Sequence, residues 1–98
     1  KIADAASVPV GGVFAFTNPS NDEPSFLLQP AAGTYLAYSG VCTHQGCTVG
    51  YDQASNEFSC PCHGARFDGT TGDVTRGPAK TPLAKLAVTS SNGSIYLV

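Results

Sequence analysis

All four cysteines and both histidines of this chain lie in two short segments that resemble each other. The first reads Cys-Thr-His-Gln-Gly-Cys over residues 42–47, and the second reads Cys-Pro-Cys-His-Gly over residues 60–64. Thiolate and imidazole are the side chains that soft and borderline metal ions prefer. A chain of 98 residues has room for one small core, which a metal or a cross-link would stabilise. The two segments therefore predict a single metal site that ties two loops together.

The rest of the composition excludes several classes of protein. Hydrophobic residues make up 42% of the chain and charged residues 12%, which is typical of a folded domain. The formal net charge is −2 and there is no basic stripe, so nucleic acid is not expected as a partner. No apolar run is long enough to span a membrane. Because the chain begins at Lys1 and contains no Met, we expect a processed or truncated domain that has lost an N-terminal signal or anchor.

The sequence predicts an all-β fold. Eleven glycines and seven prolines interrupt the chain. Between them lie short runs with β-strand character, at residues 13–17, 25–29, 34–38, 57–59, 83–89 and 95–98. The dipeptide Asn92-Gly93 between the last two runs predicts a hairpin turn, and residues 18–24 are expected to form a polar loop. We predict one domain, residues 1–98, built of stacked antiparallel sheets with a loop-rich, metal-binding insertion at residues 39–77.

The number of candidate ligands limits the choice of metal. Six candidates exceed the four that a structural zinc ion takes, so a zinc site leaves two cysteines over. A scaffold of two disulfides leaves both histidines unexplained. A two-iron cluster with two thiolates on one iron and two imidazoles on the other takes one Cys and one His from each segment. It also leaves one cysteine of each segment for a disulfide.

Both segments resemble the ligand motifs of the Rieske [2Fe–2S] family. The residues after the second segment, 76–79, read Arg-Gly-Pro-Ala and are similar to the proline-bearing third loop of that family. The resemblance covers residues 34–98, about two thirds of the chain. It implies the Rieske fold and one [2Fe–2S] cluster per chain.

The resemblance also implies a role for each cysteine and histidine. Cys42 and Cys60 are expected to bind the inner iron, and His44 and His63 the outer iron near the surface. The remaining cysteines of the two segments, at positions 47 and 62, are expected to form a disulfide that joins the loops. Imidazole ligation makes the cluster less negative than four thiolates do, which raises its reduction potential.

Further positions are expected to surround the cluster, namely Gln45, Gly46, Gly64, Ala65, Phe67 and Pro78. High-potential relatives carry hydroxyl residues where this chain has Ala65 and Phe67, and neither of these side chains can donate a hydrogen bond. We therefore expect a potential below the top of the Rieske range, which is about −150 to +300 mV. Alternatively, the two side chains fill the core, the glycines serve ordinary turns and Pro78 lies in a surface turn.

The resemblance implies one-electron transfer. Our leading hypothesis is an exported protein, soluble or membrane-tethered, because the expected disulfide between Cys47 and Cys62 indicates an extracytoplasmic compartment such as the bacterial periplasm. The expected partner is a cytochrome or a larger oxidoreductase subunit.

The alternative is the iron–sulfur subunit of a quinol-oxidising cytochrome bc-type complex, or a redox subunit of another periplasmic oxidoreductase. Gln45 weakens the quinol alternative, because such complexes usually carry Leu at that position. Arg66 and Arg76 are expected to be solvated surface charges.

Overall fold

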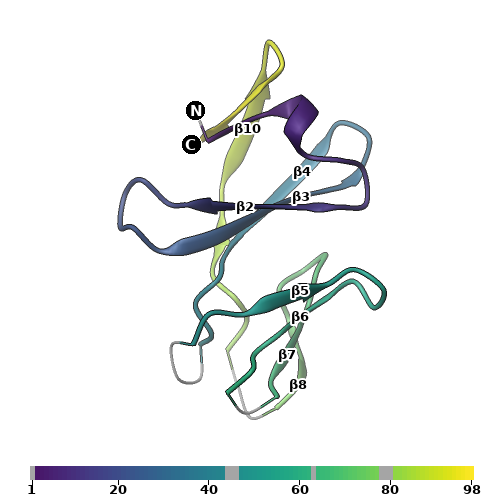
Figure 1. Ribbon diagram of the computed structural model, residues 1–98, viewed down its shortest axis with the longest axis vertical. Helices are drawn as coiled ribbons and strands as arrows, with labels where there is room; N and C mark the ends of the chain where they lie inside the picture. The colour runs from purple at the N-terminus through teal and green to yellow at the C-terminus, as the bar shows by residue number, and fades with distance from the viewer. Residues whose placement is uncertain (1, 44–46, 63, 78–80) are drawn as a thin grey trace.

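The computed structural model describes residues 2–43, 47–62, 64–77 and 81–98. In this part of the chain three antiparallel sheets account for all eleven strands, which confirms the predicted all-β class (Figure 1). The first sheet has the order β1-β11-β10, with β1 (Ala3–Asp4), β11 (Ser94–Leu97) and β10 (Val88–Ser91). A short 3-10 helix, η1 (Ala5–Ser7), follows β1.

The second and third sheets each contain four strands. The second has the order β2-β3-β4-β9, with β2 (Val13–Thr17), β3 (Pro24–Ala31), β4 (Thr34–Ser39) and β9 (Lys85–Leu86). The third has the order β5-β6-β7-β8, with β5 (Gly50–Asp52), β6 (Glu57–Ser59), β7 (Arg66–Asp68) and β8 (Val74–Arg76). The second sheet lies between the other two, and the C-terminal end of the chain lies beside the first sheet (Figure 1).

Alternation of side chains along the second sheet builds two cores. Successive residues of a strand point to opposite faces, so Leu27 and Ala37 face the first sheet, where they pack with Ile95. Their neighbours Leu28 and Tyr38 pack in the other core, which contains Cys42, Val49, Phe58, Cys60, Ala65, Phe67 and Leu83. Both cysteines that are not in a disulfide are thus anchored in the core beside the third sheet.

Most predicted strands are present, with two differences. Residues 13–17 and 57–59 match β2 and β6, and the Asn92-Gly93 turn joins β10 to β11 with positive φ angles of 52° and 77°. The single strand predicted at residues 83–89 is wrong, because the chain leaves the second sheet after β9 and pairs with β11 as β10. The predicted insertion at residues 39–77 contains a complete four-stranded sheet, of which only β6 was foreseen.

Among the described residues, no helix is long and apolar enough to cross a membrane. The division into one domain at residues 1–98 with a metal-binding part at residues 39–77 stays a prediction.

Candidate metal centre

The first cysteine loop, residues 41–48, follows β4 and leads to β5. Val41 and Thr48 form an antiparallel bridge at its base. Inside this bridge the Cys42 backbone N–H donates a hydrogen bond of 2.7 Å to the Cys47 carbonyl oxygen. The loop thus closes as a small hairpin with one cysteine at each side of its neck.

Two contacts tie the first cysteine loop to distant parts of the chain. The Gly40 N–H donates to the Pro24 carbonyl oxygen at 2.7 Å, and a Cβ at Gly40 would lie 2.8 Å from a ring carbon of Phe26. A larger residue at this position would therefore push the loop away from β3. The Thr43 hydroxyl donates to the Thr81 carbonyl oxygen at 2.6 Å, across 38 residues of sequence.

The second cysteine loop, residues 60–65, connects β6 to β7. Ser59 and Arg66 are the paired residues on either side of it. The Cys60 N–H donates to the Ala65 carbonyl oxygen at 2.8 Å, and the Gly64 N–H donates to the Cys60 carbonyl oxygen at 3.0 Å. Gly64 has a φ of +76° with open space around its Cβ position, so the turn conformation explains the glycine. Its N–H serves the loop itself, which favours the turn alternative over a contact with a cluster sulfur.

A disulfide between Cys47 and Cys62 joins the two loops, as the sequence predicted, with Cα atoms 6.5 Å apart. The other two cysteines, Cys42 and Cys60, form no disulfide and are 2% and 3% exposed. The sulfurs of Cys47, Cys60 and Cys62 lie within 4.8 Å of one another, and only the Cys60 sulfur among them is a thiol. Two buried thiols at matching positions of cross-linked loops fit the sulfur half of a two-iron cluster.

The expected imidazole ligands, His44 and His63, lie outside the described residues, as do Gln45, Gly46 and Pro78. The structure therefore describes only the cysteines of the expected ligand set, and the assignment of all four ligands stays a prediction.

Ala65 and Phe67 line the same core as the two thiols. They are 1% and 0% exposed and pack with Cys42, Cys60 and Phe58. Both side chains fill the core, as the alternative interpretation held, and neither can donate a hydrogen bond. The sulfur side of the site is therefore apolar at these two positions.

An aromatic cluster around Phe58 supports the core beneath the loops. The rings of Phe26, Tyr38 and Tyr51 lie 5.3, 5.7 and 5.0 Å from the Phe58 ring, centre to centre. The Tyr38 hydroxyl donates to the Thr70 carbonyl oxygen at 2.7 Å and so joins β4 to the turn after β7. Burial, with the nearby charges of two aspartates, raises the pKa of Tyr38 to about 12.

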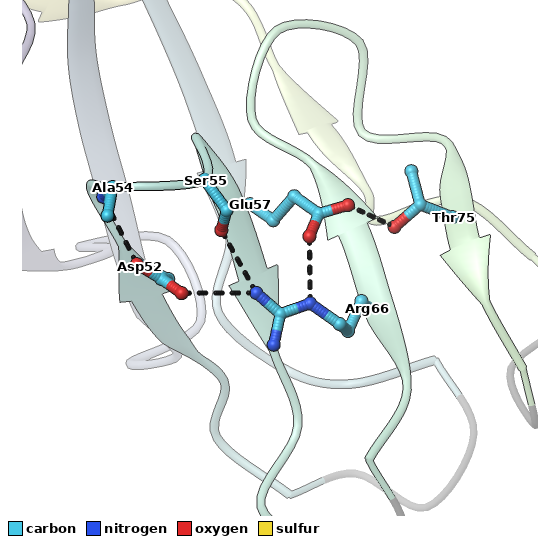
Figure 2. A network of polar contacts seen from close by, with 6 residues as sticks. All are labelled: Asp52, Ala54, Ser55, Glu57, Arg66 and Thr75. Atoms are coloured by element: carbon cyan, nitrogen blue, oxygen red, sulfur yellow. Dashed lines mark hydrogen bonds and ion pairs between the residues drawn. The ribbon is translucent and has the colours of Figure 1, made fainter.

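Arg66 is not the solvated charge that we expected from the sequence. Its side chain is 27% exposed, and its Nε donates to a carboxylate oxygen of Glu57 at 2.8 Å. One terminal nitrogen, Nη2, donates to Asp52 at 3.2 Å and to the Ser55 hydroxyl at 3.0 Å. The Thr75 hydroxyl donates to the second oxygen of Glu57 at 2.7 Å. Figure 2 shows these contacts running across all four strands of the third sheet.

The network shifts the pKa values of its members. Hydrogen bonds from the Ser55 side chain and the Arg66 guanidinium lower the pKa of Asp52. Hydrogen bonds from the Thr75 hydroxyl and Arg66 lower the pKa of Glu57, and the two carboxylates raise that of Arg66. All three groups are thereby held in their charged forms.

A fold of three antiparallel sheets with two buried thiols in cross-linked loops defines a small metal-cluster protein. The sequence pattern of the Rieske [2Fe–2S] domain matches residues 1–87. The chain belongs to the Rieske [2Fe–2S] family and is an electron-transfer domain with a cluster of that type.

The chain is similar to iron–sulfur subunits of cytochrome b6-f complexes. The chloroplastic cytochrome b6-f complex iron–sulfur subunit of Bigelowiella natans is 44% identical over 78 residues, which cover 76% of this chain and 31% of that protein. This chain spans less than half the length of the curated relatives it matches.

Solved structures agree in fold. The cyanobacterial plasma membrane Rieske protein of Synechocystis PCC 6803 superposes with a TM-score of 0.75 at 33% identity, over 86% of this chain and 85% of that chain. The ferredoxin of carbazole 1,9a-dioxygenase from Nocardioides aromaticivorans IC177 gives a TM-score of 0.75 at 23% identity, over 99% of this chain and 93% of that chain. The latter likeness concerns the fold alone.

Proposed function

We propose that this domain passes single electrons in an extracytoplasmic compartment, as an exported soluble protein or as the soluble part of a membrane-tethered one. The disulfide between Cys47 and Cys62 is the observation that carries the proposal. Such bonds persist in oxidising compartments and are rare where glutathione keeps thiols reduced. A bound [2Fe–2S] cluster supplies the one-electron redox centre.

In this proposal the thiolates of Cys42 and Cys60 hold one iron, and the imidazoles of His44 and His63 hold the other. The burial of both cysteines supports their role, because it keeps water and oxidants away from the sulfur ligands. The disulfide keeps the two loops at a fixed separation, so each loop presents its ligands in register with the other.

The partner that we propose is a cytochrome or a larger oxidoreductase subunit. A histidine-bound iron near the surface lets such a partner approach the cluster closely.

A second candidate function is that of the iron–sulfur subunit in a quinol-oxidising complex. The 44% identity to a cytochrome b6-f subunit favours it. Affinity purification of the full-length native protein from its membranes separates the two candidates. Copurification of a cytochrome b and quinol-dependent cytochrome reduction support the second, whereas a protein that exchanges electrons with a cytochrome without either supports the first.

Electron paramagnetic resonance of the dithionite-reduced protein tests the cofactor ligation. Two sulfur and two nitrogen ligands predict the rhombic signal of a Rieske cluster with an average g value below that of an all-cysteine cluster. A reduced protein that gives an all-cysteine type of signal contradicts the ligand set. Protease treatment of intact cells and of spheroplasts tests the compartment, since an extracytoplasmic domain is cleaved once the outer barrier is opened.

The apolar side chains at Ala65 and Phe67 bear on the potential. Hydrogen bonds to cluster sulfurs stabilise the reduced state, and neither side chain offers one. We expect a midpoint below the upper limit of the Rieske range, and we expect Ala65→Ser to raise it in a redox titration. Ala65→Gly, which adds no hydroxyl, is the matched control. A midpoint near the upper limit in the unmodified protein contradicts this argument.

A further inference from the structure

Arg66 occupies the neck of the second cysteine loop. It is the first residue of β7 and pairs with Ser59, the last residue of β6. The loop between them is closed by the hydrogen bond from Cys60 to Ala65. A displacement of the β7 backbone at Arg66 therefore also displaces the segment that carries Cys60.

The strands around this neck are short. Each strand of the third sheet has three residues, so few backbone hydrogen bonds fix its position. The Arg66 side chain adds bonds between strands, to Glu57 on β6 and to Asp52 on β5. Thr75 on β8 holds the other oxygen of Glu57 (Figure 2). The Arg66 guanidinium on β7 thus contacts two further strands directly, and Glu57 extends the network to β8.

The same contacts hold three charges in fixed positions. The side chains of Arg66 and Glu57 are 27% and 24% exposed and that of Asp52 is 45% exposed, so solvent screens the Asp52 charge the most. The cluster becomes more negative by one unit when it is reduced. A fixed positive charge nearby stabilises the reduced state, and a fixed negative charge stabilises the oxidised state.

We propose that Arg66 is a positioning residue for electron transfer, which fixes the neck of the second cysteine loop and, with Asp52 and Glu57, sets part of the cluster's reduction potential. The inference rests on the proposed role of Cys60 and His63 as ligands.

The test is a redox titration of the cluster-loaded protein, with the paramagnetic signal recorded for every variant. Arg66→Gln lowers the midpoint, because it removes a positive charge, whereas Glu57→Gln and Asp52→Asn raise it. Arg66→Lys keeps the charge and brings the midpoint back towards that of the unmodified protein. The matched control is Arg76→Gln, which removes the same charge from the exposed residue paired with Arg66 on β8.

The proposal is supported if Arg66→Gln and the two carboxylate variants shift the midpoint potential in opposite directions. It also requires that Arg66→Gln shifts the midpoint more than Arg76→Gln does. A purely structural role predicts shifts of the same sign in all three network variants, and that result overturns it. An equal shift of the midpoint in Arg76→Gln also overturns the proposal, because the removal of any surface cation would then have the same effect. If Arg66→Gln fails to fold, a rise of the midpoint in both carboxylate variants supports the proposal, and a fall in either one overturns it. Absence of a Rieske signal in the unmodified protein counts against the ligand assignment instead.

Discussion

The two cysteine loops have similar sequences but are held in different ways. The first loop depends on distant segments, through the contact of Gly40 with β3 and the hydrogen bond from Thr43 to Thr81. The second loop is the turn of a hairpin, and Arg66 braces its strands from within the same sheet. Both loops close with a local hydrogen bond, but the position of the first loop also depends on segments far along the chain.

This difference matters because a cluster shared between two loops needs both at once. The second loop forms with its own hairpin and makes few contacts with residues far along the chain. The first loop takes its position only after β3 and the segment around Thr81 have folded. The disulfide covalently joins the second loop, which is held within its own sheet, to the first loop, which is held by distant segments. We expect the first loop to be the weaker partner when the disulfide is removed.

The largest expected effect follows from removing a thiolate. Cys42→Ser and Cys60→Ser each take away half of the proposed sulfur ligands, so both variants should lose the cluster, despite the different support of their loops. Iron content and the paramagnetic signal after reconstitution measure this loss. The double variant Cys47→Ser/Cys62→Ser is the control and should retain a cluster. A Cys60→Ser protein with a full Rieske signal would refute the assignment of Cys60.

The next effect comes from the disulfide itself, which closes a loop with a sequence separation of 15 residues. In the chain-entropy model a loop of this size contributes about 3 kcal/mol. The double variant Cys47→Ser/Cys62→Ser should lose about that much free energy of unfolding in urea. Hydrogen exchange then separates the loops: the Cys42 amide should lose more protection than the Cys60 amide, because the second loop keeps its hairpin. Equal losses at both amides would contradict the proposed difference between the loops.

Tyr38 joins the second sheet to the third. Loss of its hydroxyl should lower the free energy of unfolding by less than loss of the disulfide does. Tyr38→Phe removes one buried hydrogen bond, to Thr70, worth about 1 kcal/mol at neutral pH. Because folding raises the pKa of Tyr38 from 10.0 to about 12, its contribution is complete below pH 10 and is lost as the pH rises towards 12. The stability difference between the unmodified protein and Tyr38→Phe should shrink over that interval in urea titrations. A difference that stays constant with pH would contradict the raised pKa.

The sequence predicted the disulfide better than it predicted the strands that support the two loops. The paired segments and their family resemblance pointed to the disulfide, and the Asn92-Gly93 turn was recognised from local chemistry alone. The strands β5, β7 and β8 were missed because three residues are too few for an alternating pattern to be recognised. The break between β9 and β10 was missed because it reflects a change of pairing partner, from β4 to β11, and not a turn residue.

Arg66 was misjudged for a related reason. Its bonds to Asp52 and Glu57 depend on the register of three strands, and a sequence with no predicted sheet in this region offers no register. One signal was available: the aromatic residues Tyr51, Phe58 and Phe67 each have a charged neighbour in the sequence, namely Asp52, Glu57 and Arg66. This pattern places the charges on one face of a hairpin once strands are assumed. Ion pairs across strands thus depend on the strand topology, which the composition of the chain does not reveal.

The smallest effect should come from acid, and it should fall on one loop. Folding lowers the pKa values of Asp52 and Glu57 from 3.8 and 4.5, so their contribution to stability is present above those values and is lost as the pH falls through the lower folded values. Exposed ion pairs contribute little, which places this effect last. On acidification, hydrogen exchange should rise at the Cys60 amide before the Cys42 amide, and Glu57→Gln should abolish that order. Acid lability that begins at the Cys42 amide would mean that the Arg66 network does not brace the second loop, and the two loops would then share a single means of support.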